Sequence, residues 1–161
     1  MGMIGYYLAL DSEDIEKIKN EELSLFDFMY NGKKYNEEYS LDIDKTWHAL
    51  YYMLSKISGD DENLRHAVPL DDIFKLNDDI PTFKLDASRV SEIAEAVNKI
   101  TKEKMLNNYS IKDMVEFNIY PVVEDEDEDE FFEYMYDYFI RLQKFFSKIA
   151  SEGKILIFCI I

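Results

Sequence analysis

The sequence is poor in the residues from which many catalytic and metal sites are built. Cys159 is its only cysteine, so the chain can form no internal disulfide and no zinc site with paired cysteines. There are two histidines and five glycines among 161 residues. Neither a phosphate-binding glycine loop nor a Gly-x-Ser-x-Gly nucleophile elbow occurs. We therefore expect no cofactor, no metal and none of the common enzyme activities.

Long apolar segments are missing as well. No apolar run approaches the ~20 residues that a helix needs to cross a bilayer. Residues 1–10 have neither the cationic start nor the small-residue cleavage site of a secretory signal. Tyr6 stands where N-myristoylation requires Ser or Thr. These features predict a cytoplasmic protein that does not bind membranes.

Basic residues are in the minority. The chain carries 34 acidic and 18 basic residues, which gives a net charge of −16. A field of this sign repels the phosphates of nucleic acids and of anionic lipids, so we expect no nucleic-acid partner. A basic protein partner agrees with this charge, and so does an acidic surface that only keeps the protein soluble.

Apolar residues, in contrast, are abundant enough to build a core. They make up 47% of the chain and include 12 Tyr and 11 Phe, which lies outside the composition of disordered chains. A length of 161 residues is typical of one domain. No repeat and no Pro/Gly/Ser-rich linker divides the chain, so we predict a single domain over residues 1–161.

The apolar periodicity predicts helices between two terminal strands. Strands are expected over residues 3–10 and 154–161, with a short extended piece at 81–85. Helices are expected at residues 12–20, 21–30, 41–57, 68–76, 88–106 and 130–151, with one further turn at 110–115. The last strand is apolar on both faces and so belongs inside a sheet. The predicted fold class is α+β, with a small sheet that contains both terminal strands as neighbours and is covered by several helices.

Four segments and the closing helix and strand carry a resemblance to a known family. The segments are Met1-Gly2-Met3-Ile4-Gly5-Tyr6, Leu41-Asp42-Ile43-Asp44-Lys45-Thr46-Trp47-His48-Ala49-Leu50, Pro69-Leu70 and Ile119-Tyr120-Pro121. Together they resemble the YfbM-like family of small bacterial proteins, which has no assigned function. The resemblance implies one cytoplasmic α+β domain and supplies no activity.

The chain departs from this family at two places. Residues 75–85 contain no glycine where family members carry a glycine-rich stretch, and an acidic run follows Tyr120-Pro121 where members tend to have a tryptophan. A family pocket built from these elements would be altered here.

Asp44, His48 and Tyr52 form the first candidate site. Their spacing of four residues places them in one row on a predicted helix. A histidine oriented by a carboxylate can act as a general base near neutral pH. The alternative, which we favour, is that Asp44 caps the helix while His48 and Tyr52 bond to backbone or water at the rim of the core. A triad would need a third group in the right place.

His66 is a weaker candidate, for a metal. It follows Asp60, Asp61 and Glu62 at a spacing that is common by chance, and no known metal-binding motif is present. We therefore favour a histidine without a metal.

An acidic run is the second candidate site. Its seven consecutive residues are Glu124, Asp125, Glu126, Asp127, Glu128, Asp129 and Glu130, and aromatic residues such as Tyr134 follow. Three interpretations are open: a solvated helix start, where negative charge is favourable; a docking edge for a basic partner; or a weak divalent-cation site.

Two functions are consistent with these patterns. The first, which we favour, is a non-enzymatic acidic protein-binding domain whose run and Tyr134 contact a basic protein, for example an immunity-type protein that neutralises a toxin. The second is a small enzyme or ligand-binding protein with a pocket around Asp44, His48 and Tyr52. It requires a concave site into which these three side chains point.

Overall fold

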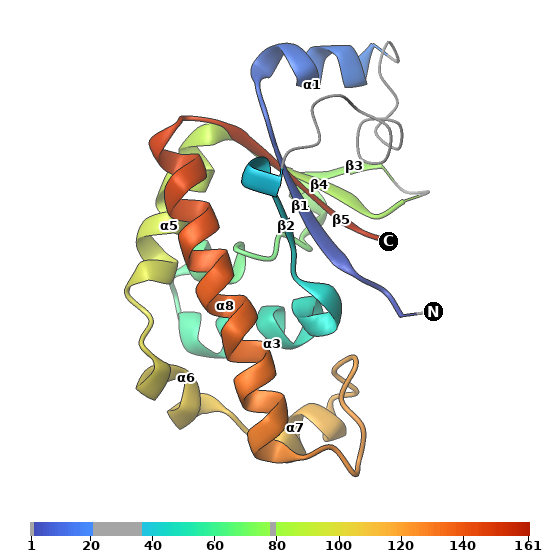
Figure 1. The fold of residues 1–161 in the computed structure, drawn as a ribbon, viewed down its shortest axis with the longest axis vertical. Helices are drawn as coiled ribbons and strands as arrows, with labels where there is room; N and C mark the ends of the chain where they lie inside the picture. The colour runs from blue at the N-terminus through green and yellow to red at the C-terminus, as the bar shows by residue number, and fades with distance from the viewer. Residues whose placement is uncertain (1, 21–36, 78–79) are drawn as a thin grey trace.

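A five-stranded antiparallel sheet carries the fold, with strand order β2-β1-β5-β4-β3 (Figure 1). The computed structural model describes residues 2–20, 37–77 and 80–161. The strands are β1 (Gly5–Leu10), β2 (Ser40–Asp42), β3 (Lys75–Asn77), β4 (Thr82–Leu85) and β5 (Ile155–Ile160). The predicted α+β class, with both terminal strands in one sheet and helices around it, is confirmed.

The two terminal strands pair along their whole length. Gly5 lies opposite Ile160 and Leu10 lies opposite Ile155, with β5 in the centre of the sheet. The prediction that the two terminal strands are neighbours in the sheet is therefore confirmed. Gly5 permits this close packing, because an added Cβ would lie 2.7 Å from Trp47 Cβ, closer than real Cβ atoms approach, so the neighbouring groups would have to shift.

The sheet is covered on both faces, since alternate residues of β1 and β5 enter two different apolar clusters. Tyr7 and Phe158 join the main core with the long helices. Tyr6 and Cys159 point to the other face, where Ile15 of α1 (Ser12–Lys19) packs on them. Figure 1 shows α1 apart from α3, α5 and α8. Because both faces of the sheet are covered, β5 can be apolar on both of its faces.

The main core is built by helices that run from the second strand to the last. They are α3 (Trp47–Ser58), α4 (Glu62–Arg65), α5 (Ala87–Asn98), α6 (Lys102–Asn108), α7 (Ile111–Glu116) and α8 (Glu128–Ser151), with the 3-10 turns η1 (Glu37–Tyr39), η2 (Asp44–Thr46) and η3 (Asp72–Phe74). The helix expected at residues 21–30 lies outside the described residues. No helix in the described ranges is long and apolar enough to cross a membrane.

The helix expected over residues 41–57 begins later than predicted. β2 and η2 occupy its first part, and α3 starts at Trp47. Asp44 is not the helix N-cap, because its backbone has φ +48° and its N–H donates to Asp42 Oδ1 at 2.6 Å. This local turn competes with the helix, as short aspartate side chains do elsewhere.

Two other helix predictions were wrong in part. Residues 68–76 form no α-helix; their second half is η3 followed by β3, which pairs with β4 at the edge of the sheet. Residues 88–106 are divided between α5 and α6, because the Thr101 side chain caps a new helix by accepting the Lys104 N–H at 3.1 Å. Long-range pairing and a capping hydroxyl thus overrode the apolar periodicity.

Candidate functional site

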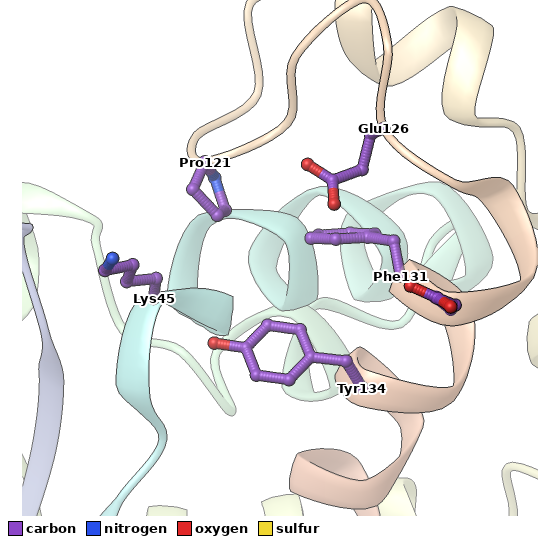
Figure 2. Close-up of a pocket in the computed structure, with 6 residues that line it drawn as sticks. Lys45, Pro121, Glu126, Phe131 and Tyr134 are labelled. Carbon is purple, nitrogen blue, oxygen red and sulfur yellow. The ribbon is translucent and has the colours of Figure 1, made fainter.

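A pocket of about 430 Å³ opens beside the N-terminal end of α8 (Figure 2). It is formed by side chains from η2, from the loop after α7 and from α8: Lys45, Pro121, Glu126, Glu130, Phe131 and Tyr134. The pocket therefore joins part of the acidic run to a turn that lies far away in the sequence.

The acidic run is divided into a loop and a helix start. Asp127 caps α8, since its Oδ1 accepts the Glu130 N–H at 2.9 Å. Three carboxylates then occupy the first helical turn, close to the positive end of the helix dipole. The interpretation of the run as a helix start is thus confirmed for residues 127–130. The preceding residues form a turn closed by a hydrogen bond from the Glu126 N–H to the Val123 carbonyl at 3.2 Å.

Aromatic rings form the inner wall of the pocket. Phe131 is 4% exposed, and its ring centroid lies 5.9 Å from that of Tyr134, which in turn lies 5.3 Å from Tyr138. In Figure 2 the Glu126 carboxylate lies over the Phe131 ring, while the Tyr134 hydroxyl points toward the turn that carries Lys45. The pocket is thus lined by a carboxylate and by aromatic rings.

Tyr134, which lines this pocket, is hydrogen-bonded to Asp44 of η2. The Tyr134 hydroxyl donates to Asp44 Oδ2 at 2.7 Å across 90 residues of sequence. Burial raises the pKa of Tyr134, and the hydrogen bond to Asp44 raises this pKa further. The phenol consequently stays protonated at neutral pH, where it acts as a hydrogen-bond donor and not as a base.

The negative charge of the run affects the pKa of a second tyrosine, Tyr109. Tyr109 donates to the Glu128 carbonyl at 3.0 Å. Burial raises the pKa of this phenol first, and the carboxylates of Glu128, Glu126, Asp129 and Asp127 raise it in addition. The run therefore creates a local field that favours protonated and positively charged groups.

His48 is engaged with the backbone, as the favoured interpretation predicted. Its Nδ1 accepts the Tyr120 N–H at 3.0 Å, and its ring stacks on Trp47 at a centroid distance of 5.2 Å. Burial lowers the pKa of His48. The neutral ring with its proton on Nε2 is the form that this hydrogen bond requires.

The three residues of the predicted row have different neighbours. Asp44 bonds to Tyr134, His48 bonds to the Tyr120 backbone, and Tyr52 packs on Phe117 with ring centroids 6.0 Å apart. Asp44 also lies before α3, so it does not share a helix face with His48. The general-base mechanism would need the carboxylate to orient the histidine, and here a backbone N–H has that position.

His66 is paired with an aspartate that the sequence pattern did not indicate. Its Nε2 lies 2.9 Å from Asp71 Oδ2, and the Arg65 guanidinium lies 3.1 Å from the same oxygen. Among the described residues, no group of three or more His, Cys, Asp or Glu side chains is placed to hold a metal ion.

Sequence reasoning missed Lys45, Pro121 and Phe131 as pocket residues. One signal was available for the wall of the pocket: Glu130 and Tyr134 are four residues apart, which places them on one face of the predicted helix. No local signal pointed to Lys45, because η2 reaches the pocket only through the packing of the sheet against α8.

Comparison with known proteins assigns a family to the chain. A family model described as a domain of unknown function (DUF1877) matches residues 1–159. The chain belongs to this family. Protein YfbM of Escherichia coli K12 is 31% identical to it, over 76% of this chain and 75% of that protein.

A solved structure confirms the DUF1877 fold. The crystal structure of YfbM from Escherichia coli, described as a protein of unknown function, superimposes with a TM-score of 0.76 at 22% identity, covering 98% of this chain and 99% of that one. The resemblance to the YfbM-like family is therefore confirmed. The family supplies a fold and no activity.

Proposed function

We propose that this DUF1877 protein is a non-enzymatic binding protein that captures a basic protein partner in the cytoplasm. A lysine or arginine side chain of the partner enters the pocket between Glu126 and Glu130. The observation that carries the proposal is that Glu126 and Glu130 line one pocket together with the aromatic side chains of Phe131 and Tyr134.

The chemistry of the pocket suits a cation. A guanidinium or ammonium group gains charge-assisted hydrogen bonds from carboxylates, and its long stem packs on aromatic faces. Within residues 2–20, 37–77 and 80–161, neither Glu126 nor Glu130 takes part in an ion pair. Lys45 is on the opposite side of the pocket from Glu126, so it leaves the carboxylate side open to a cation (Figure 2).

The surroundings of the pocket also resemble an interface. Every residue of the run except Glu126 is exposed. Two large apolar side chains lie close to it in sequence, Val123 at 52% and Phe117 at 62% exposure. Apolar contact with a charged rim is typical of protein–protein interfaces, and the rim accelerates the capture of a partner of opposite charge.

An immunity-type protein that neutralises a toxin is a concrete form of this proposal. It is supported by the small acidic domain and by the aromatic-lined pocket. A neighbouring gene for a large multidomain toxin, together with protection of cells from that toxin, would support this form.

Co-purification from the native cell at low and high salt tests the proposal. Wild-type chain is compared with the Glu126→Gln/Glu130→Gln variant and with a matched control, Glu95→Gln/Glu103→Gln, which removes the same charge from exposed positions of α5 and α6. A basic protein is expected to be retained at low salt by the wild type and the control. Each pocket carboxylate is expected to contribute about tenfold in affinity, as charge-assisted hydrogen bonds do.

Two outcomes would contradict the proposal. Either no basic protein is retained even at low salt, or the pocket variant binds the retained protein as tightly as the control does.

A further inference from the structure

The acidic pocket carries charges of both signs. Glu126 and Glu130 line it together with one cation, Lys45, and Figure 2 shows Lys45 on the side of the pocket opposite Glu126. Capture of a basic side chain uses the two carboxylates and leaves the lysine without a role. A ligand that satisfies the whole pocket therefore carries a positive charge at one end and a negative charge at the other.

None of these three charged groups is compensated in the part of the chain that the structure describes. The ion pairs among residues 2–20, 37–77 and 80–161 include neither the Lys45 ammonium nor the carboxylates of Glu126 and Glu130. Lys45 and Glu130 are exposed, and Glu126 is half-buried. A ligand can thus contact all three groups without displacing an existing partner.

Packing fixes the positions of the lysine and of the helix that carries Glu130. The Lys45 stem runs along the backbone of Gly2, since a Cβ added to this glycine would collide with Lys45 Cε. Asp44, the residue before Lys45 in η2, accepts the Tyr134 hydroxyl at 2.7 Å. Tyr134 follows Glu130 by about one turn of α8. This hydrogen bond therefore ties the turn of Lys45 to the helix of Glu130.

Aromatic surface lies between the charges. Phe131 and Tyr134 line the pocket with ring centroids 5.9 Å apart. In Figure 2 the Phe131 ring lies beside the Glu126 carboxylate, while the Tyr134 hydroxyl points toward the turn that carries Lys45. An apolar stem that joins a cation to an anion can pack on these rings. The volume of about 430 Å³ lies in the range of small-ligand sites, about 300–1,000 Å³.

A basic residue at the C-terminal end of a chain has this arrangement of groups. Its ammonium or guanidinium is joined through a methylene stem to the α-carbon that carries the terminal carboxylate. A free amino acid suits the pocket less, because its α-ammonium stands beside the carboxylate and is repelled by Lys45.

We propose that the pocket binds the C-terminal residue of the basic partner. This residue is a lysine or arginine whose cation contacts Glu126 and Glu130 and whose terminal carboxylate contacts Lys45. The inference rests on the proposed capture of a basic protein, and it adds the part of the partner that is recognised.

Three acetylated dipeptides test the inference on the unmodified chain. They are acetyl-alanyl-arginine with a free carboxylate, the same peptide as its amide, and acetyl-alanyl-glutamine with a free carboxylate. Titrations at low salt are followed by backbone amide NMR of the isotope-labelled full chain, with saturable shifts expected at Lys45, Glu126 and Tyr134.

The order of the two arginine peptides is diagnostic. A net charge of −16 repels the additional carboxylate, so the charge of the whole molecule favours the amide. Capture of the carboxylate by Lys45 gives the reverse order. The free acid is expected to bind about threefold more tightly than the amide, as one exposed ion pair contributes. The glutamine peptide, which lacks the cation, is expected to bind least.

Variants assign the two ends of the ligand. Lys45→Met is expected to reverse the order, so that the amide becomes the tighter ligand. Lys99→Met is the matched control: among the described residues Lys99 is likewise exposed and in no ion pair, and it does not line the pocket. It is expected to leave the free acid preferred. Glu126→Gln/Glu130→Gln is expected to weaken both arginine peptides.

Failure of this inference is distinguishable from failure of the proposed function. If the amide binds the wild type as tightly as the free acid, or if the preference for the free acid survives Lys45→Met, recognition of a chain end is wrong. Weakening by Glu126→Gln/Glu130→Gln would then still support capture of a basic side chain. If neither arginine peptide gives saturable shifts, both are contradicted.

Discussion

His48 shows how a single side chain is assigned its role by its neighbours. An exposed histidine at this position could act as a base, but its Nδ1 is occupied by the Tyr120 N–H and its ring is stacked on Trp47. Its hydrogen bond connects α3 to the loop that carries Tyr120 and Pro121, so His48 has a structural role here. The same residue then makes the stability of the fold sensitive to pH.

We predict that protonation of His48 destabilises the protein below about pH 6.5. Burial lowers the pKa of His48 in the folded chain, whereas the unfolded chain keeps the ordinary value of 6.5. The unfolded state therefore binds the proton first as the pH falls, so stability present above pH 6.5 is lost below it. Protonation would also abolish the acceptor that Tyr120 uses.

Chemical denaturation of the wild type and His48→Asn across a pH series checks this prediction. The Oδ1 of an asparagine can accept the same hydrogen bond and does not titrate. We expect the free energies of unfolding of the two proteins to differ by a constant above pH 6.5 and the wild type to lose stability relative to the variant below it. Parallel profiles over the whole range would show that His48 is not the titrating group.

Helix α8 contributes both to the core and to the acidic pocket. Its N-terminal end carries the carboxylates of the acidic pocket. At its C-terminal end, Lys148 and Lys154 lie 4.4 and 4.9 Å from the centre of the Tyr39 ring. Negative charge at the start and positive charge near the end both agree with the helix dipole. The helix thus positions the site and secures η1 against the core.

Removal of the α8 cap should cost measurable stability. We expect Asp127→Ala to lower the free energy of unfolding by about 1 kcal/mol, because the Glu130 N–H loses its acceptor. Urea denaturation measures this effect. Asp127→Asn separates two causes, since it keeps a capping oxygen and removes only the charge.

Asp125→Ala is the matched control for the cap. It removes the same charge from the exposed turn before the helix, where no capping role exists. We expect a change within about 0.5 kcal/mol there, as at ordinary surface positions. An equal loss at both positions would mean that Asp127 does not stabilise α8 as a cap.

At the scale of the whole molecule, charge is the dominant feature. The net charge of −16 is a property of the complete sequence, and the structure arranges it unevenly. Carboxylates gather at the start of α8 near β2 and η2, while three cations line a cavity at the β3 edge. One fold therefore separates a pocket lined by two carboxylates from a cavity lined by three basic side chains.

The net charge predicts that moderate salt stabilises the protein. Repulsion among like charges is stronger in the compact state, and it is screened as the Debye length falls from about 30 Å at 0.01 M salt to about 8 Å at 0.15 M. Salt also weakens exposed ion pairs such as Lys17–Glu13, but each of these contributes only about 0–1 kcal/mol. We expect the screening of repulsion to outweigh the weakening of ion pairs, so that added salt increases the stability of the folded protein.

Thermal unfolding at low and physiological ionic strength measures this balance. The melting temperature should rise with sodium chloride, and the rise should be smaller for a Glu124→Gln/Asp125→Asn variant, which removes two like charges from the run. A fall in melting temperature with salt would show that ion pairs outweigh the repulsion.

Local patterns in the sequence were sufficient for much of the fold. A strand that is apolar on both faces can only be satisfied inside a covered sheet, so the central position of β5 followed from residues 154–161 alone. The long amphipathic helix and its acidic start were likewise predictable, because periodicity and capping are local properties. The sequence also determined the sign of the electrostatic field.

Tertiary structure alone decided which side chains meet. Asp44 meets Tyr134 across 90 residues, and Lys75, Lys84 and Arg89 converge only because β3 pairs with β4 beside the start of α5. No periodicity encodes such contacts, since they depend on strand register and on the packing of helices against the sheet. Sequence patterns therefore determined the terminal strands, the long helix α8 and the net charge, whereas packing determined β2, β3 and the two pockets.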